Sequence, residues 1–212
     1  MKRFLLLVLP VVALAVGVPE AGDHLTHEEK LGQLWQGSLT AEASGDAATA
    51  MGKLAAFAKN GGDPFMAQLR GGWLNYSAQK HDEAARCYTE AVKLQPNALS
   101  PRLGLLNIAQ AKSDGAAAIV AAESVLKIEP TNYRALLAVA WGAFQGKDYR
   151  RSGITYQRIL TLYPEDQDAM SGVAWCAFYN GQKREARDVF RRLMSLNPDH
   201  AYVKQGIAAT SK

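Results

Sequence analysis

Histidine and cysteine are the residue types most able to do chemistry in this chain, and it has only four histidines and two cysteines. Among the histidines, only His24 and His27 lie close together. Asp23 and Glu28 beside them would complete a group able to bind a metal ion. This group lies in a polar N-terminal segment, where solvated side chains are the simpler interpretation. We therefore expect no metal site.

The two cysteines do not indicate catalysis either. Cys87 and Cys176 have no histidine near them in the repeat register described below, which argues against a nucleophilic thiol. The same register separates them by almost three units, whereas a disulfide needs Cα atoms within about 7 Å of each other. The Gly-rich stretches at 61–64 and 71–72 lack the Lys-Ser/Thr ending of a phosphate-binding loop. We expect two free thiols, no cofactor and no enzymatic activity.

The elements that would position any site are announced by a repeat. Four prolines recur 34 residues apart, at Pro96, Pro130, Pro164 and Pro198. Small residues keep the same spacing, at Ala50, Ala84, Ala118, Ser152 and Ala186. Within one period, Leu136, Val139, Ala140 and Ala143 fall on one face of a helix. A fixed period of this length predicts stacked helical units, each of which buries its apolar face against its neighbours.

Two segments carry a family resemblance, namely residues 136–164 and 170–198. Both resemble the tetratricopeptide repeat family, and residues 146–149 and 181–184 stand where that family turns between its two helices. The resemblance implies an all-α, right-handed α-solenoid of helix-turn-helix units. The units are 31–64, 65–98, 99–132, 133–166 and 167–200, followed by a capping helix over 201–212. The first unit diverges, with Gly62 in place of the proline.

The N-terminal residues predict export. Lys2 and Arg3 precede an apolar run from Phe4 to Val16, which is too short to span a bilayer of about 30 Å. This pattern is typical of a cleaved signal peptide over 1–17, with cleavage near 15–21 and a polar segment over 22–30 after it. We expect an exported protein located in the periplasm, without stable membrane insertion after cleavage.

The charge of the chain argues against nucleic-acid binding. The formal net charge is +4, and Lys2 and Arg3 supply two of those positive charges within the signal peptide. The remaining chain is only mildly basic and lacks the basic stripe that contacts phosphates.

A ladder of large side chains recurs on the first helices of the units. One row is Trp73, Asn107, Trp141 and Trp175, and the next is Tyr76, Gln110, Phe144 and Phe178, with Arg134 nearby. Trp and Tyr dominate binding hot spots, so we predict that these nine residues form a partner-binding surface on the concave side. The alternative is that the rings pack between neighbouring first helices. Some members of the family bind a carboxylate with Lys, Asn and Arg; only Asn107 matches here, so we expect no such clamp.

These predictions favour a scaffold for protein–protein interaction, serving an envelope assembly or export system and binding a partner polypeptide in the aromatic groove. Two alternatives stay open. One is a glycan-binding accessory of polysaccharide export, because aromatic rings also stack on sugars. The other is a self-assembling structural unit, in which the rings form a homo-oligomer interface.

Overall fold

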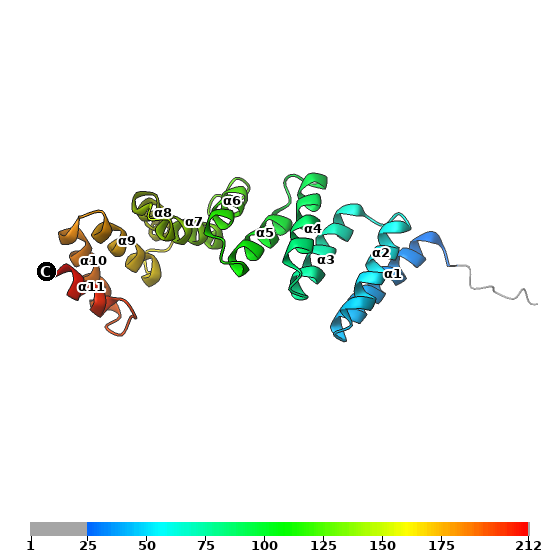
Figure 1. The fold of residues 1–212 in the computed structure, drawn as a ribbon, viewed down its shortest axis with the longest axis horizontal. Helices are drawn as coiled ribbons and strands as arrows, with labels where there is room; N and C mark the ends of the chain where they lie inside the picture. The colour runs from blue at the N-terminus through cyan, green and yellow to red at the C-terminus, as the bar shows by residue number, and fades with distance from the viewer. Residues whose placement is uncertain (1–24, 212) are drawn as a thin grey trace, which may run out of the picture.

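The computed structural model describes residues 25–211, so the predicted signal peptide at 1–17 lies outside the described residues. Between residues 25 and 211 the chain forms eleven α-helices and no strand. The helices are α1 (His27–Ala43), α2 (Ala47–Lys59), α3 (Pro64–Ser77), α4 (His81–Leu94), α5 (Leu99–Ala111), α6 (Gly115–Leu126), α7 (Tyr133–Gln145), α8 (Tyr149–Leu162), α9 (Gln167–Tyr179), α10 (Lys183–Leu196) and α11 (Val203–Thr210). Figure 1 shows them as an elongated array in which consecutive helices stack from one end to the other. The chain is therefore an all-α solenoid.

Side-chain caps fix where most helices begin. Asp46, Asp63, Asp114, Asp148 and Asp166 each accept a hydrogen bond from a backbone N–H of the first turn. Such a cap satisfies a donor that has no partner within the helix. At α1, Thr26 and Glu29 form a reciprocal capping box. Helix α1 thus begins at His27, inside the segment 22–30 that the sequence assigned to a polar extension.

The turn inside each helix pair has one residue in the left-handed region. These residues are Gly45, Gln79, Ser113, Lys147 and Gly181, again 34 apart. The residue after each of them donates its N–H to the carbonyl five residues earlier, as Asp148 does to Ala143. In the fourth unit the left-handed residue is Lys147, with φ 61°, and not the neighbouring Gly146, which the sequence suggested. Hydrogen bonding therefore fixes the turn where glycine is missing.

The helix faces predicted from periodicity are confirmed. Leu136, Val139, Ala140 and Ala143 are all buried. The five small residues of the second helices are buried as well, and Ser152 Oγ donates to the carbonyl of Ala140 across the helix pair at 2.8 Å. Close approach of the helices thus depends on these side chains.

Contacts between successive pairs repeat in the same way. A ring on the second helix of one unit packs against a glycine on the next first helix, as Tyr88 does on Gly104, Tyr156 on Gly172 and Phe190 on Gly206. A Cβ added at Gly172 would lie 2.5 Å from the Tyr156 ring, closer than atoms can approach. Between the third and fourth units the positions are Ala122 and Ala138, so both partners are small there. These junctions determine which side chains face the concave side.

Both cysteines are free thiols in different helix pairs. Burial raises the pKa of each, and Cys176 Sγ donates to Ser152 Oγ at 3.2 Å inside the core. None of the helices from residue 25 to residue 211 has the length and apolar character that crossing a bilayer requires.

Candidate binding groove

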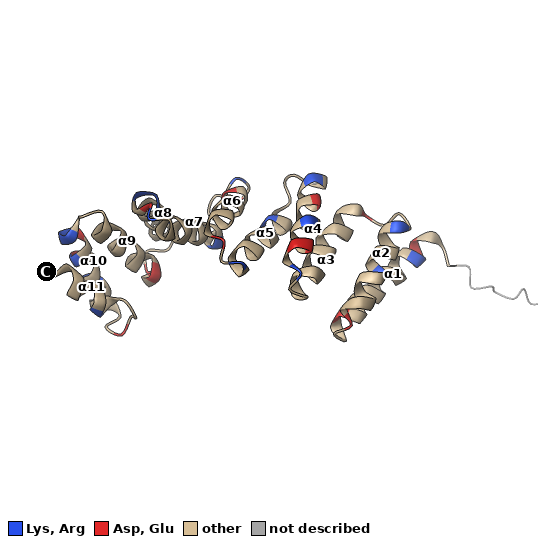
Figure 2. Ribbon diagram, in the orientation of Figure 1, with Lys and Arg blue, Asp and Glu red and all other residues tan. Residues whose placement is uncertain are grey.

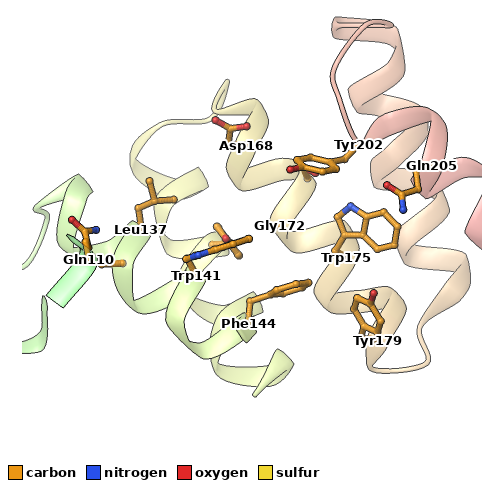
Figure 3. A pocket seen from close by; sticks show the side chains of 13 residues that line it. Gln110, Leu137, Trp141, Phe144, Asp168, Gly172, Trp175, Tyr179, Tyr202 and Gln205 are labelled. Carbon is orange, nitrogen blue, oxygen red and sulfur yellow. The ribbon is translucent and has the colours of Figure 1, made fainter. Parts of the chain in front are cut away.

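The first helices line two hollows on the solenoid. We call the hollow lined by α7, α9 and the capping segment the C-terminal groove; it encloses about 480 Å³. Its walls are Leu137, Trp141, Phe144, Trp175, Tyr179 and Tyr202, and its floor is Tyr156 with Gly172 (Figure 3). We call the hollow lined by α1, α3 and α5 the N-terminal groove; it encloses about 420 Å³. Its walls include Trp35, Arg70, Trp73 and Asn107, and its floor is Tyr88 with Gly104.

Residues of both grooves recur in the 34-residue register. One row along the first helices is Ser100, Asp168 and Tyr202, interrupted by Arg134, and another is Leu69, Leu103, Leu137, Ser171 and Gln205. Because every first helix has the same orientation to its neighbours, equivalent positions present their side chains to the same side. The groove is therefore a property of the repeat, and its chemistry depends on which residues fill these positions.

The walls of the C-terminal groove are a continuous set of aromatic contacts. Trp141 and Phe144 are nearly parallel, with ring centroids 5.9 Å apart and 9° between their planes. Phe144 then meets Tyr179 edge to face at 5.8 Å, and Tyr179 lies 6.0 Å from Trp175. Tyr179 also stacks on Tyr149 at 4.7 Å, which holds its ring in place. Aromatic pairs at these separations stabilise one another, so the wall is preorganised.

These rings remain accessible to solvent. Trp141 and Tyr202 each expose 53% of their surface, and Tyr179 exposes 49%. Figure 3 shows Trp141 and Trp175 on opposite sides of the hollow, with Tyr202 above and Phe144 below the space between them. An apolar hollow with open aromatic walls is typical of a site that binds another molecule.

Charge in the C-terminal groove is negative and sits at its rim. Asp168 near the start of α9 lines the hollow, and its side chain is 80% exposed. His200 Nε2 lies 3.3 Å from Asp168 Oδ1. Among the groove-lining residues of the described chain there is no Lys or Arg. The groove thus offers a carboxylate, two glutamine side chains and aromatic faces.

The N-terminal groove has its charges already paired. The guanidinium of Arg70 forms an ion pair with Glu42 and lies 6.0 Å above the Trp35 ring. Glu42 also accepts a hydrogen bond from Trp73 Nε1 at 2.6 Å. Burial lowers the pKa of Arg70, and Glu42 compensates its charge. The polar groups of this wall are therefore satisfied within the chain.

The floor tyrosines are buried and held neutral. Burial raises the pKa of Tyr88 to about 12, and burial likewise raises the pKa of Tyr156. Each exposes 5% of its surface. Because ionisation would place a charge against a helix backbone at glycine, these rings serve packing and not proton transfer.

The structure divides the nine predicted binding residues between different places. Gln110, Trp141, Phe144 and Trp175 line the C-terminal groove, whereas Trp73 and Asn107 line the N-terminal groove. Phe178, Tyr76 and Arg134 line neither. Phe178 packs on the cluster of Ala174, Ala186 and Phe190, and Tyr76 packs on the cluster around Tyr88. Arg134 donates from Nη2 to Asn107 Oδ1 and interrupts the ladder between the two grooves.

Sequence reasoning missed several wall residues. Tyr179 takes the place predicted for Phe178, because the last turn of α9 rotates Phe178 toward α10 and α11. Tyr202 and Gln205 come from the capping segment, where the sequence assigned Tyr202 to an apolar face that covers the core. A signal was present, since Tyr202 is 34 residues after Asp168 and Gln205 is 34 after Ser171. The cap therefore continues the register of the first helices.

No group of three or more His, Cys, Asp or Glu side chains from residue 25 to residue 211 is arranged to hold a metal ion. Asp23 and His24 of the metal-binding group considered above lie outside this range.

Comparisons with known proteins agree with this architecture. Residues 168–200 match the sequence profile of the tetratricopeptide repeat family. A tetratricopeptide repeat protein from Parabacteroides merdae ATCC 43184 superposes with a TM-score of 0.70 at 19% identity, over 85% of this chain and 72% of that one. A MamA segment from Desulfovibrio magneticus RS-1 superposes with a TM-score of 0.66 at 16% identity, over 83% and 99% of the two chains. No curated protein matches the chain.

A further similar structure is that of YrrB, described as a TPR protein with an unusual peptide-binding site. It superposes with a TM-score of 0.60 at 19% identity, over 68% of this chain and 74% of that one. Likeness at these identities establishes the fold.

Proposed function

The chain is a tetratricopeptide-repeat protein by its fold and by its matched repeat, and from this premise we propose that it is a non-catalytic scaffold for a partner polypeptide. The partner segment binds in the C-terminal groove, with apolar side chains against Trp141, Phe144 and Trp175. The observation that carries this proposal is the open aromatic wall over a closed floor: Trp141 is 53% exposed while Tyr156 beneath it is 5% exposed.

The energetics favour this groove over the rest of the surface. Large exposed rings are costly to leave in water, and their burial contributes much of the affinity of protein interfaces. The rings of this wall are held by one another, so little side-chain entropy is lost when a ligand covers them. The hollow of about 480 Å³ accommodates a few side chains of an extended or helical segment. A solved relative of the same fold is described as having a peptide-binding site, which supports a polypeptide ligand.

Alanine substitutions in the wall test the proposal. Trp141→Ala and Trp175→Ala should each weaken binding of an identified partner by about 2 kcal/mol or more, which is roughly a 30-fold rise in Kd. The partner is obtained by cross-linking from a photoreactive residue at position 205 on the groove rim, and its affinity is measured by calorimetry. Trp73→Ala is the matched control, because Trp73 is similarly exposed at 45% but lies in the other groove. Unchanged affinity in both groove variants would sink the proposal.

The cellular role remains part of the proposal. A role in envelope assembly or export from the periplasm rests on the signal-like residues 1–17 alone. Fractionation of cells and N-terminal sequencing of the purified protein test it, with a new N-terminus near 15–21 as the expected result. An intact Met1 in a cytoplasmic fraction would contradict it.

The two alternative functions give different readings in the same experiments. Titration of tryptophan fluorescence with oligosaccharides would respond at Trp141 and Trp175 if the groove bound glycans. Light scattering over a wide concentration range would show a growing mass if the groove joined copies of this chain. The proposed scaffold is expected to respond to peptides only and to remain a monomer.

A further inference from the structure

We infer that the segment bound in the C-terminal groove carries an arginine, whose guanidinium lies between Trp141 and Trp175 and pairs with Asp168. This inference rests on the proposed function and names the chemistry of the ligand. It stands on two observations: the groove lacks a cation that its groups could bind, and the other groove of the same molecule shows such groups around an arginine.

The N-terminal groove supplies the internal template. There, a guanidinium from Arg70 is bound by the carboxylate of Glu42 and covered by the ring of Trp35 at 6.0 Å, while Trp73 donates its N–H to the same carboxylate. The set is therefore two tryptophans, one carboxylate and one guanidinium. A guanidinium fits such a set because it is planar, weakly hydrated and able to stack on an indole while its edge donates to a carboxylate.

The C-terminal groove presents the same set without its cation. Trp141 and Trp175 face each other across the hollow, and Asp168 stands at its rim (Figure 3). The indole N–H of neither tryptophan donates to any residue from 25 to 211, in contrast with that of Trp73. Asp168 keeps one carboxylate oxygen beyond the one that faces His200, and its side chain is 80% exposed. A positively charged group from outside would complete the set.

The surroundings of the groove add to its negative character. Glu165 and Asp166 precede Asp168 at the start of α9, where Figure 2 shows acidic residues at the entrance of the helix. The nearby cations are engaged elsewhere. Arg134 donates to Asn107, Arg187 donates to the carbonyl of Thr210, and Lys204 lies 3.6 Å from Asp199. The field in the groove therefore favours a basic ligand, and long-range attraction speeds its association at low salt.

Arginine fits this groove better than lysine. The rings around the hollow exclude water from the inserted side chain, which penalises the strongly hydrated ammonium of lysine more than a guanidinium. Only a planar cation can stack between two indoles and still direct two N–H groups toward one carboxylate. The methylene groups of arginine would pack along Leu137 and Phe144.

Synthetic peptides test the inference on the full chain. The probes are acetylated, amidated pentapeptides of sequence Ser-Leu-Arg-Leu-Ser and the same sequence with citrulline or lysine in the centre. Citrulline has the shape of arginine without its charge. Titration followed by tryptophan fluorescence should give a Kd about fivefold lower for the arginine peptide than for either counterpart, and this advantage should shrink as salt rises.

Variants locate the effect. Asp168→Asn should abolish the difference between the arginine and citrulline peptides while leaving the Kd of the citrulline peptide unchanged. Asp199→Asn is the matched control, because it also removes one exposed carboxylate but lies outside the groove and should preserve the difference. Thermal unfolding of Asp168→Asn within about 2 °C of the parent would show that the fold is retained.

Equal binding of the arginine and citrulline peptides, or equal binding of arginine and lysine, would overturn the inference, as would a lack of response to any peptide. The proposed function fails by a different result. If the arginine and citrulline peptides bind equally and both lose affinity in Trp141→Ala, the groove binds polypeptide and only the arginine is wrong.

Discussion

The two grooves of this molecule have the same floor and different walls. In each, a tyrosine from a second helix packs against a glycine of the next first helix, Tyr88 on Gly104 and Tyr156 on Gly172. The walls differ because the N-terminal groove pairs Arg70, Glu42 and Trp73 internally, whereas the C-terminal groove leaves Trp141, Trp175 and Asp168 without such partners. The floor is what the repeat needs to stack, and the walls are free to vary.

This difference explains why two similar hollows are not equivalent as binding sites. A hydrogen bond or ion pair already formed within the chain must be broken before a ligand can use its groups, which offsets most of the gain. Open groups carry no such cost, because they exchange only water. The rings of the C-terminal groove are therefore better placed to bind a partner than those of the N-terminal groove, although both grooves contain tryptophan.

The largest expected effect concerns the shared floor. Tyr88→Ala and Tyr156→Ala should each lower the free energy of unfolding by about 3 kcal/mol, because each removes a buried ring and leaves a cavity against glycine. Urea unfolding followed by circular dichroism measures the loss, and amide exchange in the flanking helices shows whether it is local.

Tyr202→Ala is the control for this pair, since the ring is 53% exposed and its removal should cost less than about 1 kcal/mol. If one floor substitution cost 3 kcal/mol and the other less than 1, the two floors would not be equivalent and the comparison would be wrong.

A smaller effect is expected when the glycine of the same contact is changed. Gly104→Ala and Gly172→Ala should each destabilise the protein by about 1 to 3 kcal/mol, because the added Cβ would lie 2.5 Å from a tyrosine ring. The matched control is Gly115→Ala in α6, where no atom lies within 4 Å of the added Cβ. Thermal melts of the three variants decide the point, and a control that destabilises as much as the other two would contradict the packing argument.

The contrast between floor and walls also marks what the sequence can predict. The prolines at 34-residue spacing and the stripe from Leu136 to Ala143 predict the helix pairs and their buried faces, because the same packing recurs at every junction. Trp141, Phe144 and Trp175 were placed in a groove by the same periodicity, and the structure brings them together there.

The remaining wall residues depend on contacts that do not repeat. Phe178 turns away because α11 ends the array and packs Ile207 near it, so the last unit has a neighbour unlike the others. Arg134 interrupts the ladder through a side-chain hydrogen bond to Asn107, which no helical period encodes. The pairing of Arg70 with Glu42 joins residues 28 apart on different units, and it decides that Trp73 belongs to a satisfied wall.

The smallest expected effect separates the two walls themselves. Trp73→Phe removes an indole N–H that donates to Glu42 at 2.6 Å, so it should lower the free energy of unfolding by about 0.5 to 1 kcal/mol. Trp141→Phe removes an N–H that donates to no residue between 25 and 211, and its effect should stay within about 0.3 kcal/mol. Both substitutions keep an aromatic ring at a similarly exposed position, which makes them a matched pair. Urea titrations of the two variants measure the difference, and Glu42→Gln combined with Trp73→Phe shows whether the loss passes through the carboxylate. A Trp141→Phe variant that loses as much stability as Trp73→Phe would mean that the C-terminal wall is also engaged within the chain, and the distinction between a closed and an open groove would fail.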